Sequence, residues 1–160
     1  SNFRAGVNAG NSIASGGNFN VCIGDEAGTA ISTADANVAV GYEALATEDG
    51  HGFNVAIGYR ALKTQNAGRS AFNTAVGYQA GFFATTGYLN TFIGSEAGLY
   101  TTTSDSSTFV GVQAGLGVDG TRLTGNENTM VGRGAGRYLQ GVAAHNTGIG
   151  GQALSIIQLL

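Results

Sequence analysis

The sequence of 160 residues has no proline, no tryptophan and a single cysteine, and only 11% of its residues are charged. One cysteine excludes an intrachain disulfide, so the fold does not rely on the covalent cross-links that many small secreted domains use. The seven lysines and arginines are scattered along the chain and the net charge is -3, which predicts no binding to nucleic acid. No apolar run is long enough to cross a bilayer, so we expect no membrane insertion.

The residues that are abundant are small. Hydrophobic residues make up 42% of the chain and glycine occupies 28 positions, while alanine and valine dominate the apolar set. This content is too apolar for a disordered polymer, and it differs from that of a globule with a bulky core. We therefore expect a folded chain with a narrow and tightly packed interior.

One short motif repeats along the whole chain, and its period predicts a solenoid. The motif is an asparagine, a valine or threonine, a variable residue, an isoleucine or valine, and a glycine. Clear copies begin at Asn20, Asn37, Asn54, Asn73, Asn90, Ser107, Asn128 and Asn146, after a weaker first copy at Asn2. The phased glycines are Gly6, Gly24, Gly41, Gly58, Gly77, Gly94, Gly111, Gly132 and Gly150, at intervals of 17 to 19 residues with one interval of 21. An alanine stands three residues after each of them: Ala9, Ala27, Ala44, Ala61, Ala80, Ala97, Ala114, Ala135 and Ala153.

Each repeat predicts one short β-strand. The β-branched residue before the glycine suits a pleated strand, so we expect its side chain to point inward, as does the valine or threonine two residues earlier, with the residue between them pointing outward. The glycine either has a backbone conformation barred to other residues or lets another backbone approach closely, and the constant alanine indicates the same crowding. The asparagine either takes a left-handed turn or stacks in an amide ladder. We favour a corner position.

These features predict an all-β fold, a β-solenoid (a parallel β-roll) of about nine rungs over residues 1–154. Each rung has room for a second strand. The loops between motifs vary in length, as surface insertions do, and the longest is 116–127. The last residues, 155–160, are apolar and depart from the repeat, which predicts a cap or a subunit contact. Each rung offers little apolar surface for a free-standing coil, and small residues at a fixed phase suit a close three-fold axis. We therefore expect a homotrimer.

Two segments carry a resemblance to known families. The blocks Asn-Thr-Ala-Val-Gly-Tyr-Gln-Ala-Gly at 73–81 and Asn-Thr-Phe-Ile-Gly-Ser-Glu-Ala-Gly at 90–98 resemble the repeats of bacteriophage tail fibres. They are also similar to the head repeats of YadA-like trimeric autotransporter adhesins, although the usual adhesin repeat is shorter. The resemblance implies a homotrimeric, left-handed β-roll fibre, exposed on a virion or outside the cell, with a shaft or receptor-binding role.

Acidic residues at one phase of the repeat are the first candidates for chemistry. Glu26 and Glu43 lie two residues after the glycines of neighbouring rungs, and such a carboxylate pair would supply the acid and base of a polysaccharide-cleaving tailspike. A polar ladder on a solvated face explains the same positions without chemistry, because these residues obey the repeat. We therefore expect no catalytic residue.

Three tyrosines and two histidines are the remaining candidates. Tyr42, Tyr59 and Tyr78 follow the phased glycine in consecutive rungs, which predicts a stacked aromatic ladder that either only packs or contacts a receptor. His51 and His145 are lone histidines in different loops, without a second ligand at metal spacing. We expect no metal and no cofactor.

The function that these expectations favour is a structural segment of an extracellular or virion fibre, not an enzyme. Its partners would be further copies of the same chain and a cell-surface glycan or protein receptor that the loops contact. Two alternatives stay open. One is a subunit that assembles end to end into an extracellular filament through its terminal strands, and the other is a tailspike that cleaves polysaccharide.

Overall fold

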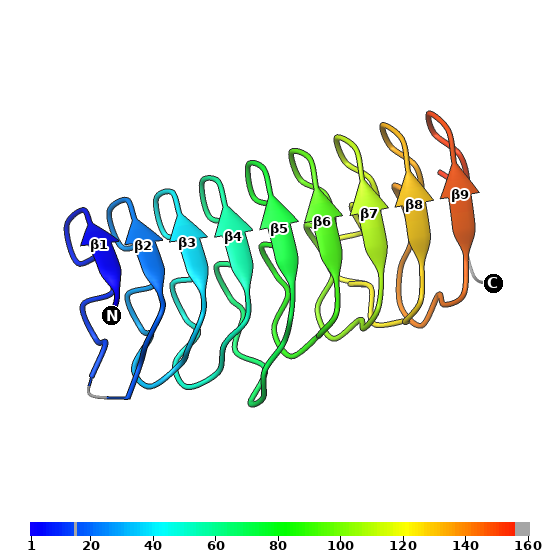
Figure 1. Ribbon diagram of the computed structural model, residues 1–160. Coiled ribbons are helices and arrows are strands. Elements are labelled where there is room, and N and C mark those ends of the chain that lie inside the picture. Colours follow the sequence, from blue (N-terminus) through cyan, green and yellow to red (C-terminus); the bar gives the residue numbers. More distant parts are fainter. Residues whose placement is uncertain (15, 156–160) are drawn as a thin grey trace.

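The computed structural model describes residues 1–14 and 16–155, which form a β-solenoid of about eight turns. Its strands are β1 (Phe3–Ala5), β2 (Val21–Ile23), β3 (Val38–Val40), β4 (Val55–Ile57), β5 (Thr74–Val76), β6 (Thr91–Ile93), β7 (Thr108–Val110), β8 (Thr129–Val131) and β9 (Thr147–Ile149). They lie in sequence order in one parallel sheet (Figure 1). This part of the chain contains no helix, and hence none that could span a membrane. The prediction of an all-β solenoid is confirmed.

Each turn of the coil contains only one strand, so the second strand that a rung could have held is absent from the described residues. The return path consists of turns because several of its residues have a positive φ. In the third rung these are Gly41 (127°), Glu43 (51°), Leu45 (50°) and Phe53 (66°). An extended strand requires a negative φ at every residue, so this path cannot pair as a second sheet.

Strand pairing stacks the phased glycines on one another. Gly41 donates its backbone N–H to the carbonyl oxygen of Ile23 at 2.7 Å. A Cβ atom built on Gly41 would lie 2.5 Å from the carbonyl oxygen of Gly58, and the φ of Gly41 is +127°. Both reasons for a glycine therefore apply here: the backbone conformation is one that other residues rarely adopt, and the next rung is in contact.

The middle residue of each strand points into the coil. In β2 to β8 these side chains are fully buried: Cys22, Ala39, Ala56, Ala75, Phe92, Phe109 and Met130. The residues before the glycine face outward, and Ile23, Ile57 and Ile93 are 37%, 38% and 40% exposed. The prediction that the β-branched residues point inward is therefore wrong. A three-residue strand has one side chain on one face and two on the other, and the narrow coil accommodates the single one.

The residue after the constant alanine compensates for the size of the middle residue. Where the strand contributes Ala39, the coil is filled by Leu45, which is fully buried. Where the strand contributes Phe92, the corresponding residue is Gly98, and a Cβ there would lie 2.5 Å from the Phe92 ring. These rungs keep close packing by pairing a small residue with a large one. The rung of β5 has Ala75 and Gly81 at the two positions, and there Phe92 and Leu62 of the neighbouring rungs fill the space beside Gly81.

The motif asparagines form an amide ladder inside the coil. The Oδ1 atom of Asn20 accepts the backbone N–H of Asn37 (2.9 Å), and that of Asn37 accepts the backbone N–H of Asn54 (3.0 Å). The Nδ2 atom of Asn20 donates to the carbonyl oxygen of Ala34 at 2.7 Å. The left-handed conformation belongs to the preceding residue, for example Phe53 (φ +66°), which therefore makes the corner. The amides satisfy buried backbone groups that no second strand is present to pair.

One interior position holds a carboxylate. The seventh residue after the phased glycine faces the interior in seven rungs: Ile13, Ile31, Glu48, Gln65, Ala84, Thr101 and Leu139. Glu48 is the only charged residue in this column, and its side chain is completely buried. Burial, followed by the negative charge of Asp49, raises the pKa of Glu48 to about 7.

Replacing Glu48 by glutamine should stabilise the protein at high pH in a buffer that contains a chelator. The folded-state pKa of Glu48 exceeds its unfolded value, so the free energy of unfolding falls as pH rises through about 7. An amide avoids this loss, and Gln65 shows that the column accepts one. We expect Glu48→Gln to gain up to about 3 kcal/mol at pH 8.5 and little at pH 4.5. Urea unfolding at both pH values measures the difference, and an equal gain at both would contradict the ionisation argument.

Candidate functional site

The outer face of the sheet carries side chains in rows that run along the molecule. We define this outer face by three rows. The first row precedes the phased glycines: Ile23, Val40, Ile57, Val76, Ile93, Val110, Val131 and Ile149. The second row opens the strands: Val21, Val38, Val55, Thr74, Thr91, Thr108, Thr129 and Thr147. The third row precedes the motif asparagine or serine: Phe19, Ala36, Phe53, Phe72, Leu89, Ser106, Glu127 and His145.

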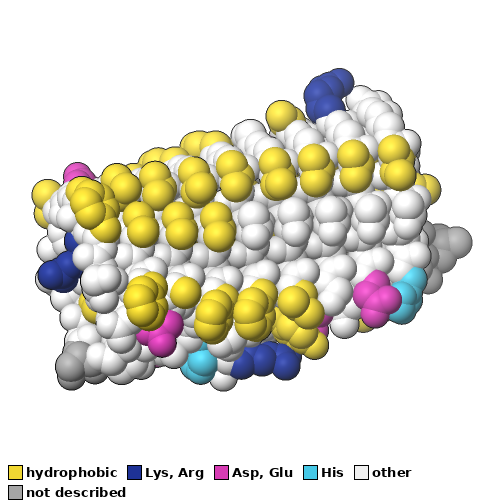
Figure 2. Space-filling view, viewed as in Figure 1, with side chains coloured by type: hydrophobic (Ala, Val, Ile, Leu, Met, Phe, Trp, Pro, Cys, Tyr) yellow, Lys and Arg dark blue, Asp and Glu magenta, His cyan; other side chains and the backbone are white. Residues whose placement is uncertain are grey.

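The outer face is more apolar towards the N-terminus. The first row is aliphatic throughout, whereas the second changes from valine to threonine at Thr74 and the third becomes polar after Leu89. Figure 2 shows the difference: one hydrophobic row continues across the molecule, and the rows below it end part of the way along. Only this region presents three apolar rows side by side.

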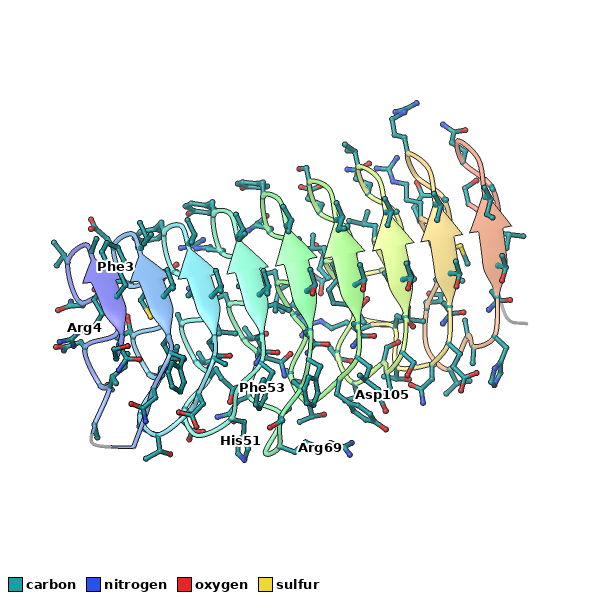
Figure 3. The ribbon with its side chains drawn as sticks, in the orientation of Figure 1. Phe3, Arg4, His51, Phe53, Arg69 and Asp105 are labelled. Atoms are coloured by element: carbon teal, nitrogen blue, oxygen red, sulfur yellow. The ribbon has the colours of Figure 1, made fainter. Side chains whose placement is uncertain are left out.

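The third row was not anticipated from the sequence. Phe19 and Phe72 are 71% and 51% exposed, and the rings of Phe53 and Phe72 stack with centroids 5.1 Å apart. Figure 3 shows Phe53 projecting from the corner below β4. The signal that could have found this row is the aromatic or aliphatic residue that comes directly before the motif asparagine in several rungs.

The outer face exposes apolar side chains in continuous rows. Its first and second rows consist of side chains that lie in register on a parallel sheet, so they form flat and continuous ridges. Soluble monomers rarely expose a contiguous apolar patch of more than a few hundred Å², and larger ones mark interaction surfaces. The outer face is therefore the candidate functional site.

The three tyrosines form the ladder that the sequence predicts. Tyr42 and Tyr59 stack with ring centroids 5.4 Å apart and an interplanar angle of 20°, and Tyr59 and Tyr78 do so at 5.4 Å and 9°. The guanidinium carbon of Arg60 lies 4.9 Å from the centre of the Tyr59 ring. Stacking covers both faces of Tyr59, so a ligand would meet edges and hydroxyl groups there, and an open ring face only at the two ends of the ladder.

The candidate acid and base lie in different environments. Glu43 binds Arg60 through Oε2 at 2.5 Å and Lys63 through Oε1 at 2.9 Å. Burial would raise the pKa of Glu43, but the hydrogen bonds from Lys63 and Arg60 outweigh it and hold that pKa below its usual value. Glu26 accepts a hydrogen bond from Thr29 at 3.0 Å. A general acid needs a raised pKa, so the geometry of Glu43 favours a structural ion pair.

The long loop leaves the coil and returns to it. Leu123 is fully buried and pairs with Thr101 in an isolated parallel bridge, so the inserted residues lie before it. The guanidinium carbon of Arg122 lies 3.9 Å from the centre of the Phe83 ring, and Arg122 also pairs with Asp119 at 3.5 Å. Beside the loop is an open groove of about 620 Å³, lined among others by Thr102, Asp119, Thr121, Arg122 and Thr124. Its threonines and its two charged side chains, Asp119 and Arg122, make this loop the best candidate for a receptor contact.

His145 and the C-terminal segment are the remaining features that the sequence singles out. His145 lies in the third row, 3.1 Å from a carboxylate oxygen of Glu127. Ser155 donates its backbone N–H to the carbonyl oxygen of Gln152, and residues 156–160, expected to form a cap or subunit contact, lie outside the described residues. Comparison with protein-family models, curated proteins and solved structures gives no match.

Proposed function

We propose that the chain is a structural segment of a fibre exposed on a virion or outside the cell, in which three left-handed coils associate through their outer faces. The observation that carries this proposal is the outer face itself, with its continuous aliphatic row and exposed phenylalanines. The repeat gives rigidity, and the loops, including the groove beside Arg122, are free to contact a cell-surface glycan or protein receptor. The activity is mechanical and adhesive, without a catalytic step.

The dimensions of the outer face suit such an interface. Nine strands at about 4.8 Å spacing give a face about 40 Å long. Its width of three rows, about 15 Å, gives roughly 600 Å² on each chain, so a trimer would cover about 1800 Å² in all, divided among its three contacts. The side chains are β-branched or aromatic, so little rotamer entropy is lost when they are covered.

The corner position of the third row favours a three-fold arrangement over a two-fold one. Strand residues and corner residues lie on adjacent sides of the coil, so each chain presents two different strips. A contact in which one strip meets the other is heterologous, and such contacts form a ring when the rotation between copies closes. Three copies around one axis cover both strips of every chain.

The mass of the native assembly tests the proposal. Three chains of 16.1 kDa give about 48 kDa, and we expect this mass by native mass spectrometry and light scattering at micromolar concentration. Scattering should also give a rod about 40 Å long. A particle of one or two chains would contradict the three-fold proposal.

A second candidate function is end-to-end assembly into a filament through the terminal strands. Each glycine from Gly6 to Gly132 has the glycine of the following rung against it, whereas a Cβ on Gly150 meets no described atom within 4 Å. In such a filament a rung of another copy would lie against Gly150. Electron microscopy distinguishes the two outcomes: long filaments support the second candidate, and isolated short rods reject it.

A further inference from the structure

One corner of the coil departs from the repeat at two positions in the same rung. Glu48 occupies the interior column that otherwise holds neutral residues. His51 lies three residues before Asn54, where the other rungs have small residues such as Ala34, Gly87 and Ser104. Residues that obey a repeat need only a structural explanation. Glu48 and His51 depart from the repeat side by side, and both are residue types that bind metals. Their presence therefore requires a functional explanation.

The structure brings these two side chains and a third ligand together. The Nδ1 atom of His51 lies 3.6 Å from the Oε1 atom of Glu48. The carboxylate of Asp49 joins them, and one ligand atom from each residue lies within 4.8 Å of the other two. Zinc bonds of about 2.0–2.2 Å at a tetrahedral angle place two ligand atoms about 3.4 Å apart. The spacing of His51 and Glu48 is close to this value.

The cluster also contains buried polar atoms that have no partner. The Oε2 atom of Glu48 and the Nδ1 atom of His51 are both buried, and neither has a hydrogen-bond partner among the described residues. The Oε1 atom of Glu48 accepts the backbone N–H of His51 at 3.2 Å. The Glu48 side chain is completely buried, while the His51 side chain is 33% exposed. No lysine or arginine forms an ion pair with Glu48 or Asp49 in this part of the chain. A buried carboxylate normally requires such a partner or a metal.

The geometry points to a binding site for a divalent transition-metal ion of the zinc class, formed by Glu48, Asp49 and His51. One nitrogen and two carboxylate oxygens suit zinc or manganese better than calcium or magnesium, which require six or more oxygen ligands. Asp49 is exposed and His51 is partly exposed, so an ion enters from solvent and keeps at least one water ligand. The bound ion holds the corner closed beneath β4 and compensates the buried charge.

Zinc titration of the full chain tests this inference. After dialysis against a chelator, calorimetry should show one zinc ion per chain with micromolar affinity in the wild type. The affinity should fall at least 100-fold in Glu48→Gln and in His51→Ala. The matched control is His145→Ala, which removes the other histidine and should bind zinc as the wild type does. Magnesium should give no heat.

Thermal unfolding at one fixed protein concentration supplies the second readout. Zinc should raise the melting temperature of the wild type and of His145→Ala by several degrees, and leave that of Glu48→Gln unchanged. Circular dichroism shows whether each variant keeps its fold. Absence of zinc binding by the wild type, or equal binding by Glu48→Gln, would overturn the inference, and neither result would affect the fibre proposal.

Discussion

A chain that carries lysine at both Ile57 and Ile93 should remain folded and lose its association with other copies. Both residues belong to the aliphatic row of the outer face and point away from the core, where they are 38% and 40% exposed. In the proposed trimer they meet neighbouring chains, so the double variant would place six ammonium groups near one axis. A buried charge without a partner costs several kcal/mol. We therefore expect association to weaken by at least 1000-fold, with monomers at micromolar concentration.

Light scattering and circular dichroism of the same samples measure this prediction. The matched control is the double variant Thr86→Lys and Thr103→Lys, which adds the same charge at exposed loop residues and should keep the mass of the wild type. The strand spectrum of the double variant should persist because neither side chain contributes to the interior. A double variant that still associates as the wild type does would show that the outer face is not the interface.

The repeat let the fold be predicted from sequence in most respects. The phased glycines and the constant alanines required crowded rungs in register, and the structure buries Ala44 and Ala61 completely beneath stacked glycines. The favoured corner position of the asparagine is wrong, and the structure has the other alternative, the amide ladder. The choice between them depends on which residue has the positive φ, and in the structure this is the residue before the asparagine. The identity of the asparagine does not reveal which of the two residues has the positive φ.

The direction in which the strand side chains point could not be predicted from the strand alone. In Val-Ala-Val the usual period-two rule assigns the larger residues to the core, but Ala39 points into the coil, where Leu45 fills the remaining space, and the valines face outward. A signal was present outside the strand. Leucine follows the constant alanine where the middle residue is Ala39, and glycine follows it where the middle residue is Phe92. This exchange of size identifies the two positions as interior neighbours.

The proposed zinc site was not predicted from the sequence, because the burial of its carboxylate depends on an interior column of the coil. Glu48, Asp49 and His51 are close in sequence, yet a turn of polar residues is normally solvated. What distinguishes them is that Glu48 shares a column with Ile31 and Gln65 and is buried with them. The length of the repeat fixes that column, so counting seven residues from each phased glycine would have identified the carboxylate.

Alanine at Gly94 should be far more destabilising than alanine at Gly150, although both glycines have a similar φ. Gly94 has a φ of +130° and a Cβ there would lie 2.5 Å from the carbonyl oxygen of Gly111. Gly150 has a φ of +119° and meets no described atom within 4 Å. In Gly150→Ala the free energy of unfolding should therefore fall only by the cost of the backbone conformation, about 1–2 kcal/mol. Gly94→Ala must also separate two paired strands, which we expect to cost at least about 4 kcal/mol.

Chemical unfolding and hydrogen exchange measure these two costs separately. In Gly94→Ala the amides of β6 and β7 should exchange much faster than in the wild type, because the clash lies between rigid backbones that no rotamer change can relieve. In Gly150→Ala faster exchange should be confined to the last rung. Similar losses in both variants would mean that backbone conformation alone selects glycine. A large difference would show that contact between successive rungs, at a distance no Cβ atom tolerates, determines this position throughout the coil.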